Sequence, residues 1–291
     1  MFDKAICWLN GQIIPAADAR ISVLDHGFLY GDGVFEGVRF YHKKTFRLAQ
    51  HIQRLQHSAA ALQLTFPVTE TQLIAAIEQT IQASPLDDGY LRIIITRGVG
   101  VLGIDPQSCH HPALIIIADQ LHMISNEQRK QGIKAIIAST RRSTPDRLDP
   151  RIKSLNYLNS ILARMEANYA RVEEAIMLND RGNVAEGTAD NVFIVQNQVL
   201  LTPPVSEGAL AGITRQTILE LAQQRGITTR ETPLTPYDLY TADECFLSGT
   251  GAKLIPVKEI DGRKLRTCPG DTYQQLATAF TDLVKNEIAA C

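Results

Sequence analysis

The sequence predicts an α+β protein built from two domains, and three observations support this fold class. The chain has 291 residues, a length typical of one large domain or two medium ones. Strand-like and helix-like segments are mixed in both halves of the chain. A polar stretch at residues 119–132, with room for one short helix, separates the halves. We therefore expect a small α/β domain at 1–118, a linker at 119–132 and a larger domain at 133–291.

The first half contains two amphipathic helices among apolar strands. Residues 49–64 and 71–83 carry apolar side chains at helical spacing. Strands rich in β-branched and aromatic residues are expected at 6–9, 34–41, 90–96 and 113–118. The first strand ends at Asn10-Gly11, a strong hairpin signal. The last two are near-continuous apolar runs, of the kind that a sheet buries on both faces.

The second half has more strands than helices. Strands are expected at 133–139, 175–178, 191–195, 199–202, 244–248 and 254–260. Helices are expected at about 155–171, 214–225 and 272–287. Gly226 follows the second of these helices directly, at a position where glycine commonly ends a helix.

Composition and charge exclude several classes of protein. Hydrophobic residues make up 45% of the chain, which excludes a disordered chain, and the net charge of −2 argues against a broad nucleic-acid-binding surface. No apolar run approaches the ~20 residues that cross a bilayer, and the first residues lack the pattern of a signal peptide. We therefore expect no membrane span and no export. The five scattered cysteines fit no metal or redox motif and indicate free thiols in a reducing cytoplasm.

Two single residues could carry chemistry. Lys153 lies beside apolar residues near a predicted helix start, where desolvation would favour the uncharged amine, a nucleophile for carbonyl groups. Glu186 lies between small residues and could keep the nitrogen of a pyridine ring protonated. Each also has a plainer explanation. Lys153 could be a surface lysine that lies along apolar neighbours, and Glu186 could be a turn residue that faces water.

Two glycine-containing turns are suited to phosphate. Gly212-Ile213-Thr214-Arg215 opens a predicted helix, where backbone N–H groups bind phosphate, although Thr214 could simply cap the helix. Ser248-Gly249-Thr250-Gly251-Ala252 follows a strand and suits an anion-binding nest, or else a plain tight turn. A nucleophilic lysine, a carboxylate for a ring nitrogen and two phosphate-binding turns are together the parts that hold pyridoxal phosphate.

Seven segments between about Trp8 and Val257 occur in the same order as the motifs of a known protein family. They are LYGDGVFEGVR at 29–39, HIQRL at 51–55, YLR at 90–92, KSLNY at 153–157, EGTADN at 186–191, LAGITR at 210–215 and SGTGA at 248–252. With these segments the chain resembles the fold-type IV pyridoxal-phosphate enzymes and, among them, the branched-chain amino-acid aminotransferases. The resemblance implies a small α/β domain, a linker and a larger pseudo-barrel domain, with the cofactor in the cleft between them. It also implies a homodimer or larger homo-oligomer in which neighbours complete each other's pockets.

The resemblance assigns cofactor-binding roles residue by residue. Lys153 matches the lysine that holds the cofactor covalently and moves the proton between substrate Cα and cofactor C4′. Tyr157 matches the residue near the cofactor's phenolic oxygen, Glu186 the partner of the pyridine nitrogen, and Leu210 the residue that packs on the ring face. The residues matched to the phosphate are Arg54, Gly212, Ile213, Thr214 and Thr250. No metal ion is implied.

The substrate side is assigned in the same way. Tyr90 and Arg92 match a pair near the α-carboxylate, which N–H groups of Thr250 and Gly251 would complete. The residues implied in the side-chain pocket are Tyr30, Phe35, Gly37 and Val101. Arg39 is our candidate for the γ-carboxylate of glutamate, because an unpaired buried carboxylate is very costly. Arg39 could instead make only a structural ion pair.

The predicted activity is transamination of L-leucine, L-isoleucine and L-valine with 2-oxoglutarate. Gln120 and Met123 stand where the enteric-type enzymes have bulky aromatic residues, which leaves the side-chain preference open. Thr96-Arg97-Gly98 is similar to the D-amino-acid aminotransferases, but the Arg-x-His pair of those enzymes does not follow it. A D-amino-acid or (R)-amine transaminase, or an aminodeoxychorismate lyase of the same fold, therefore stay as alternatives.

Overall fold

The computed structural model describes residues 4–121 and 123–290, and the contacts within the chain divide it into two units. The first unit comprises Met1–His122, Ile152–Asn156 and Glu287–Cys291, and the second comprises Met123–Arg151 and Tyr157–Asn286. The first unit ends inside the segment expected as a linker. It also takes in residues 152–156, which the sequence places in the larger domain.

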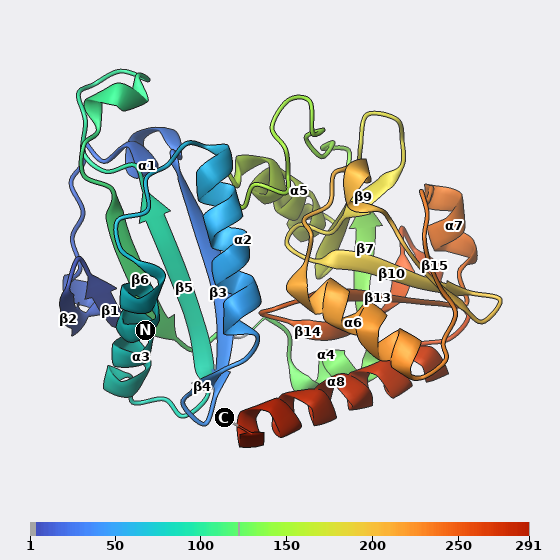
Figure 1. The fold of residues 1–291 in the computed structure, drawn as a ribbon. Helices are drawn as coiled ribbons and strands as arrows, with labels where there is room; N and C mark the ends of the chain where they lie inside the picture. The colour runs from blue at the N-terminus through green and yellow to red at the C-terminus, as the bar shows by residue number, and fades with distance from the viewer. Residues whose placement is uncertain (1–3, 122, 291) are drawn as a thin grey trace. The chain divides into compact units, whose positions relative to one another are not determined.

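The first unit is built on an antiparallel sheet of six strands in the order β2-β1-β6-β5-β3-β4 (Figure 1). The strands are β1 (Ile6–Leu9), β2 (Gln12–Pro15), β3 (Gly33–Tyr41), β4 (Lys44–Thr45), β5 (Gly89–Thr96) and β6 (Ala113–Asp119). The helices are α1 (His26–Tyr30), α2 (Leu48–Ala61) and α3 (Glu70–Ala83). Figure 1 shows α2 and α3 lying against one face of this sheet.

Side chains that alternate along β3 and β5 form the core beneath α2 and α3. Val38 and Leu91 are fully buried there against Leu55 of α2 and Ile77 of α3. The intervening residues of β5 are only half-buried, because the two helices cover one face alone. The prediction that residues 90–96 are buried on both faces is therefore wrong. The half-buried face of the sheet is the one on which binding residues could lie.

The predicted hairpin after β1 is confirmed. Asn10 and Gly11 have φ angles of 46° and 98°, and Leu9 pairs with Gln12 across the turn. Two successive residues with positive φ are what a type I′ turn needs. Asparagine tolerates this conformation and glycine adopts it without strain.

The second unit is built on a mixed sheet in the order β12-β11-β10-β13-β14-β7-β8-β9, with β15 paired to β14. The strands are β7 (Ile133–Ile137), β8 (Glu174–Leu178), β9 (Val184–Glu186), β10 (Asn191–Gln196), β11 (Val199–Thr202), β12 (Thr229–Glu231), β13 (Glu244–Gly249), β14 (Lys253–Ile260) and β15 (Arg263–Lys264). The helices are α4 (Asn126–Gln131), α5 (Leu158–Tyr169), α6 (Ile213–Gln224), α7 (Pro236–Thr241) and α8 (Asp271–Ala290), of which α8 passes into the first unit from Glu287 on. Short 3₁₀ turns lie at Ala16–Asp18, Pro106–Ser108 and Val205–Glu207.

The helix predicted from residue 155 begins later, at Leu158. The preceding residues bond to β3 instead: Leu155 N donates to Gly33 O over 2.9 Å, and Ser154 forms an isolated bridge with Val34. These main-chain bonds tie the segment to the first unit. They are long-range contacts, which helical periodicity cannot reveal.

Most other predicted elements are confirmed within a few residues. Gly226 follows α6 closely with a φ of 70°, as expected for a residue that ends a helix. The sequence missed short elements such as β9 and α7, whose few residues carry no periodic signal. Within residues 4–121 and 123–290, none of the helices combines the length and the apolar character that crossing a bilayer requires.

One carboxylate joins α5 to the end of β7. Glu166 accepts hydrogen bonds from the backbone N–H and the hydroxyl of both Ser139 and Thr140, over 2.6–2.9 Å. Partial burial alone would raise the pKa of Glu166. The hydrogen bonds from Thr140 and Ser139 outweigh burial and lower this pKa to about 2.

Glu166→Gln should lower the free energy of unfolding at pH 7 by roughly 1 kcal/mol, because one of two charged acceptor oxygens is lost. The pKa of the folded chain lies below the unfolded value of about 4.3, so the stabilisation is present above that pH and is lost as the pH falls toward 2. Urea unfolding at pH 7 and pH 3 measures both values. Glu78→Gln, at an exposed position of α3, is the control. A gap between Glu166→Gln and wild type that widens in acid would contradict this account.

Candidate active site

Five residues expected near the substrate lie on one face of the first unit's sheet. In the pairing of β3 with β5, Gly37 lies opposite Arg92 and Arg39 opposite Tyr90. Because side chains alternate along a strand, Phe35 shares the face of Gly37 and Arg39. This is the half-buried face, opposite the core under α2 and α3.

Glycine at position 37 makes room for the ring of Tyr90. A Cβ at this position would lie 1.9 Å from the Tyr90 hydroxyl oxygen and 2.6 Å from Cζ. The guanidinium carbon of Arg39 lies 5.8 Å from the centroid of the same ring, and Arg39 Nη2 donates to Leu121 O over 3.0 Å. Tyr90 thus lies directly over β3, with Arg39 next to it.

Two cationic side chains meet at the ring of Phe35. The Arg92 guanidinium carbon lies 4.1 Å from the ring centroid, and Lys153 Nζ lies 4.6 Å from it. Both distances are in the range of cation–π attraction. Phe35 is 5% exposed, so its ring is a fixed apolar surface beside both charges.

The backbone of Lys153 is held from two sides. Its N–H donates to the hydroxyl of Ser58 on α2 over 3.1 Å, and its carbonyl accepts from Phe35 N over 2.9 Å. The backbone of Lys153 therefore lies between α2 and β3. The structure thus brings Lys153, Phe35, Arg92 and Tyr90 close together, while their roles in a shared site stay predictions.

Arg54 lies on the other side of β3 in a buried charged cluster. Its Nε donates to Glu36 Oε1 over 2.6 Å and its Nη2 to Glu36 Oε2 over 2.9 Å. His51 Nδ1 contacts the same Oε2 over 2.7 Å. Burial alone would raise the pKa of Glu36, but the charge of Arg54 and the hydrogen bonds from His51 and Arg54 hold that pKa well below its usual range. Glu36 is therefore a carboxylate with no exposed surface.

Glu186 lies in the second unit and is 4% exposed. Arg142 Nη2 lies 2.5 Å from its Oε1, and Leu210 N and Asn191 Nδ2 donate to Oε2 over 3.0 and 3.3 Å. All three partners are donors, which suits a carboxylate acceptor. Glu186 is thus not the water-facing turn residue of the plainer explanation.

The start of α6 is shaped for an anion. Gly212 occupies the cap position, and within the described residues no side chain caps the helix, so Thr214 is not its cap. A Cβ at Gly212 would lie 2.0 Å from Asn191 Oδ1. The first N–H groups of this twelve-residue helix, those of Ile213 and Thr214, have no intrahelical acceptor and suit a phosphate.

The second predicted phosphate turn lies between β13 and β14. Thr250 and Gly251 are half-buried there. A Cβ at Gly249, just before the turn, would lie 2.3 Å from Asp190 Oδ1. This close approach explains why glycine ends β13.

Three predicted residues lie elsewhere. Tyr30 and Val101 belong to two paired surface segments, where Gly103 N donates to the Tyr30 hydroxyl over 2.9 Å and His26 Nε2 lies 3.0 Å from Val101 O. Both side chains are exposed, and neither residue belongs to β3 or β5. Tyr157 is half-buried and precedes α5. Their assigned roles stay predictions.

The chemical groups of these residues are of the types that pyridoxal phosphate needs. Arg54 and the start of α6 supply cationic and N–H donors for a phosphate, Glu186 supplies a buried acceptor for a ring N–H, and Lys153 supplies an amine for the aldehyde. Residues 4–121 and 123–290 contain no cluster of three His, Cys, Asp or Glu side chains placed to hold a metal ion.

Comparison with known proteins agrees with this chemistry. The family described as amino-transferase class IV matches residues 33–260. A Methanocaldococcus jannaschii protein, provisionally named a branched-chain-amino-acid aminotransferase, is 48% identical over 95% of both chains. The crystal structure of the Escherichia coli branched-chain amino acid aminotransferase superposes with a TM-score of 0.92 at 34% identity, over 96% of this chain and 94% of that one. The branched-chain amino acid aminotransferase from Thermobaculum terrenum, in its PLP-containing holo-form, superposes with a TM-score of 0.87 at 30% identity, over 98% and 95%.

The fold is that of a fold-type IV aminotransferase. The chain belongs to the class-IV aminotransferase family. The family predicted from the sequence, its α+β fold and its pyridoxal phosphate cofactor are therefore confirmed.

Sequence reasoning assigned no role to Arg142, Glu36 or His51, which hold Glu186 and Arg54. Glu36 and His51 stand in the matched segments, and the available signal for Glu36 was a charged residue inside a predicted strand of apolar neighbours. Arg142 lies in a polar loop before Lys153, and nothing in its local sequence marks it.

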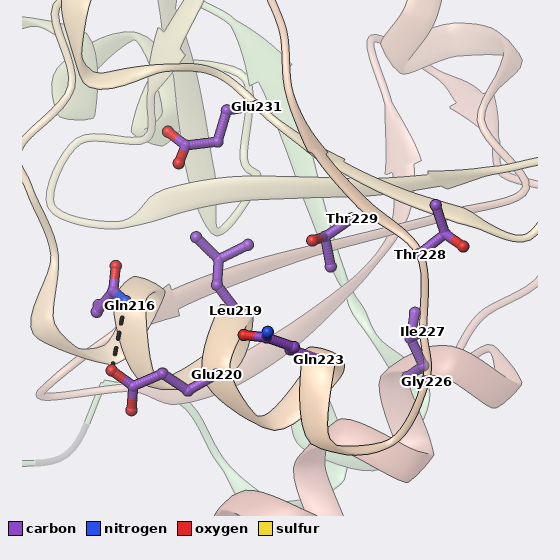
Figure 2. A pocket seen from close by; sticks show the side chains of 9 residues that line it. All are labelled: Gln216, Leu219, Glu220, Gln223, Gly226, Ile227, Thr228, Thr229 and Glu231. Atoms are coloured by element: carbon purple, nitrogen blue, oxygen red, sulfur yellow. Dashed lines mark hydrogen bonds between the residues drawn. The ribbon is translucent and has the colours of Figure 1, made fainter.

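A hollow of about 660 Å³ lies elsewhere in the second unit, along α6 and β12 (Figure 2). Figure 2 shows Gln216, Glu220 and Gln223 lining it from the helix, with Thr228 and Thr229 on the neighbouring segment. None of its lining residues is among those predicted for the cofactor or the substrate. Its lining includes neither Glu186 nor Gly212, Ile213 and Thr214.

Glu186→Gln should lower kcat at least about tenfold, which corresponds to ~1.4 kcal/mol of transition-state stabilisation. The substitution removes the charge that pairs with Arg142 and that the sequence analysis assigns to the ring N–H. Steady-state kinetics on the holoenzyme measure kcat, and the absorbance of bound cofactor reports its retention. Glu207→Gln is the matched control, because Glu207 is also a buried carboxylate of this unit, bonded to Arg181 and Asn179. A wild-type kcat in Glu186→Gln would show that the charge has no electronic role.

Proposed function

We propose that this chain transfers the amino group of L-leucine, L-isoleucine and L-valine to 2-oxoglutarate, giving branched 2-oxo acids and glutamate. The observation that carries the proposal is the ring of Phe35 with Lys153 and Arg92 beside it. An apolar surface next to an amine and a fixed cation suits an apolar amino acid bound by its carboxylate. The names of the relatives support the same substrate class.

The proposed roles of the cofactor and of the side chains follow from the hydrogen-bonding and charged groups that each side chain supplies. Pyridoxal phosphate supplies an aldehyde for the amino group and a ring that withdraws electrons from the substrate Cα. Lys153 would hold the cofactor and move the proton at that carbon. Glu186 would accept the ring N–H. The phosphate would be bound by Arg54, Gly212, Ile213, Thr214 and Thr250, with Tyr157 at the phenolic oxygen and Leu210 against the ring.

The substrate's carboxylate would be bound by Arg92 and Tyr90, with N–H groups from Thr250 and Gly251. Phe35, Gly37, Tyr30 and Val101 would form the side-chain pocket. Arg39 would meet the γ-carboxylate of glutamate or 2-oxoglutarate. The nearness of Arg39 to Tyr90 supports this last assignment, since a buried carboxylate needs a cationic partner.

A screen of amino donors tests the proposal. Wild-type holoenzyme mixed with each amino acid in turn should lose the visible absorbance of bound cofactor with L-leucine, L-isoleucine, L-valine and L-glutamate. Lys153→Ala should show neither the change nor turnover, because its amine is gone, while Lys43→Ala, which removes a lysine that binds the end of α3, should behave as wild type. A response confined to D-amino acids or to (R)-amines would overturn the substrate assignment. Pyruvate released from an amino-substituted chorismate without any 2-oxo acid would show a lyase instead.

We further propose a homodimer, because each unit exposes a group of apolar side chains. Leu158, Ile161, Leu162, Met165 and Tyr169 of α5 are 43–80% exposed and recur at helical spacing, so they form one stripe. The surface segments of the first unit expose Val23, Phe28, Val101, Leu102 and Ile104, which are 65–85% exposed. Such concentrations of apolar surface usually mark an interface, and a second copy of the chain is the occupant that the sequence resemblance implies.

Ile161→Glu should shift the assembly toward the 32.1 kDa single chain, because a dimer would bury the new charge without a partner. Light scattering after size-exclusion chromatography measures the mass. Tyr237→Glu, at a position of α7 that is 71% exposed, is the matched control and should leave the dimer intact. A wild-type protein that runs as a monomer would overturn the proposal, as would an Ile161→Glu variant that stays dimeric.

We place the enzyme in the cytoplasm. Cys7, Cys109, Cys245 and Cys268 are all free thiols. Free thiols fit a reducing compartment, where disulfides rarely form.

A further inference from the structure

The buried cluster around Glu36 has a geometry that goes beyond charge neutralisation. Two parallel hydrogen bonds from Arg54 and one from His51 end on its carboxylate, and Gly37 N approaches the same group at 3.2 Å. A bidentate pair of this kind fixes the plane of the guanidinium as well as its position. The Arg54 side chain is 13% exposed and that of Glu36 is fully buried, so water can hardly compete.

His51 completes the cluster as a neutral donor. Burial lowers the pKa of His51, which favours the uncharged ring. A carboxylate can only accept, so the ring proton lies on Nδ1. His51 and Arg54 are three residues apart on α2 and share the helix face that meets Glu36.

The same face of α2 also fixes Lys153. Ser58 lies one turn after Arg54, and its hydroxyl accepts the Lys153 N–H over 3.1 Å. β3 contributes on both sides: Glu36 binds Arg54, while the neighbouring Phe35 binds the Lys153 carbonyl. The distance between the guanidinium of Arg54 and the backbone of Lys153 is thus set by two adjacent residues of one strand.

We propose that Glu36 is a positioning residue for cofactor phosphate: its bidentate pair with Arg54 orients the guanidinium toward the phosphate, at a fixed separation from Lys153. This rests on the proposed role of Arg54 as a phosphate ligand. Glu36 itself touches neither the substrate nor the cofactor. Its effect is selective for ligands that carry a phosphate, because the aldehyde and the ring are recognised by other residues.

Pyridoxal phosphate and pyridoxal, which lacks the phosphate, separate this role from a purely structural one. The resident cofactor is removed from the holoenzyme with hydroxylamine, and binding of each compound is titrated by its absorbance. Glu36→Gln should raise the Kd of pyridoxal phosphate by about tenfold or more and leave that of pyridoxal within about twofold, since only Arg54 is misplaced. Glu36→Asp, which keeps the charge but shortens the side chain, should show the same selectivity and covers the case in which Glu36→Gln does not fold.

Two further variants make the test specific. In an Arg54→Ala background, Glu36→Gln should cause no additional selective loss, because Glu36 acts through Arg54. Asp32→Asn is the matched control, since Asp32 makes a bidentate pair with Arg97 in the same unit, over 2.8 and 2.9 Å. It should leave the ratio of the two Kd values unchanged.

Three results would overturn the proposal: an equal loss of both compounds in the Glu36 variants, unchanged binding of pyridoxal phosphate in them, or a further selective loss in the Arg54→Ala background. Failure of the proposed function looks different. If the substrate assignment fails, the amino-donor screen responds to other amines while the two Kd values still separate in the Glu36 variants. If the phosphate role of Arg54 fails, Arg54→Ala alone leaves the ratio of the two Kd values at its wild-type level.

Discussion

The two-residue repeat of β3 is the constraint on which the first unit's chemistry depends. Even-numbered positions face α2 and α3, where Val38 and Phe40 fill the core. Odd-numbered positions face the half-buried side, where Phe35, Gly37 and Arg39 lie. A shift of one residue in the register of β3 would exchange the two sets, placing Arg39 in the core and Phe40 outside it. The eight-residue ladder with β5 holds that register.

Glu36 is the charged residue among the even-numbered positions of β3 that face α2 and α3, and its neighbours offset the cost of burying its charge. A lone buried carboxylate would be very costly, but Arg54 cannot be deprotonated and gives two parallel bonds, and His51 gives a third. Breaking one partner of such a cluster leaves an uncompensated charge in an apolar layer. Glu186 in the second unit follows the same principle, with Arg142 as its permanent cation. Both units thus use a buried ion pair to hold one side chain of the predicted site.

Glycines mark the places where side chains come close to the backbone. Gly37 leaves room for the Tyr90 ring, and Gly212 leaves room for the Asn191 amide, which in turn binds Leu210 O and Glu186. Neither glycine has a positive φ angle, so their role is space and not backbone freedom. This explains why the motifs that the sequence analysis identified contain glycine next to the residues assigned to chemistry.

The sequence alone predicted the longer strands, the main helices and the family, because these depend on hydrophobic periodicity and on motifs that can be read along the chain. It also named Lys153, Arg92 and Glu186, whose residue types define their chemistry. Only the tertiary structure decided which side chains hold them. Arg142 meets Glu186 from far along the chain, and Ser58 meets Lys153 across 95 residues. Leu155, predicted to begin a helix, instead bonds to Gly33 of β3. Such long-range pairings depend on strand register and on helix packing, which no local pattern of residues encodes.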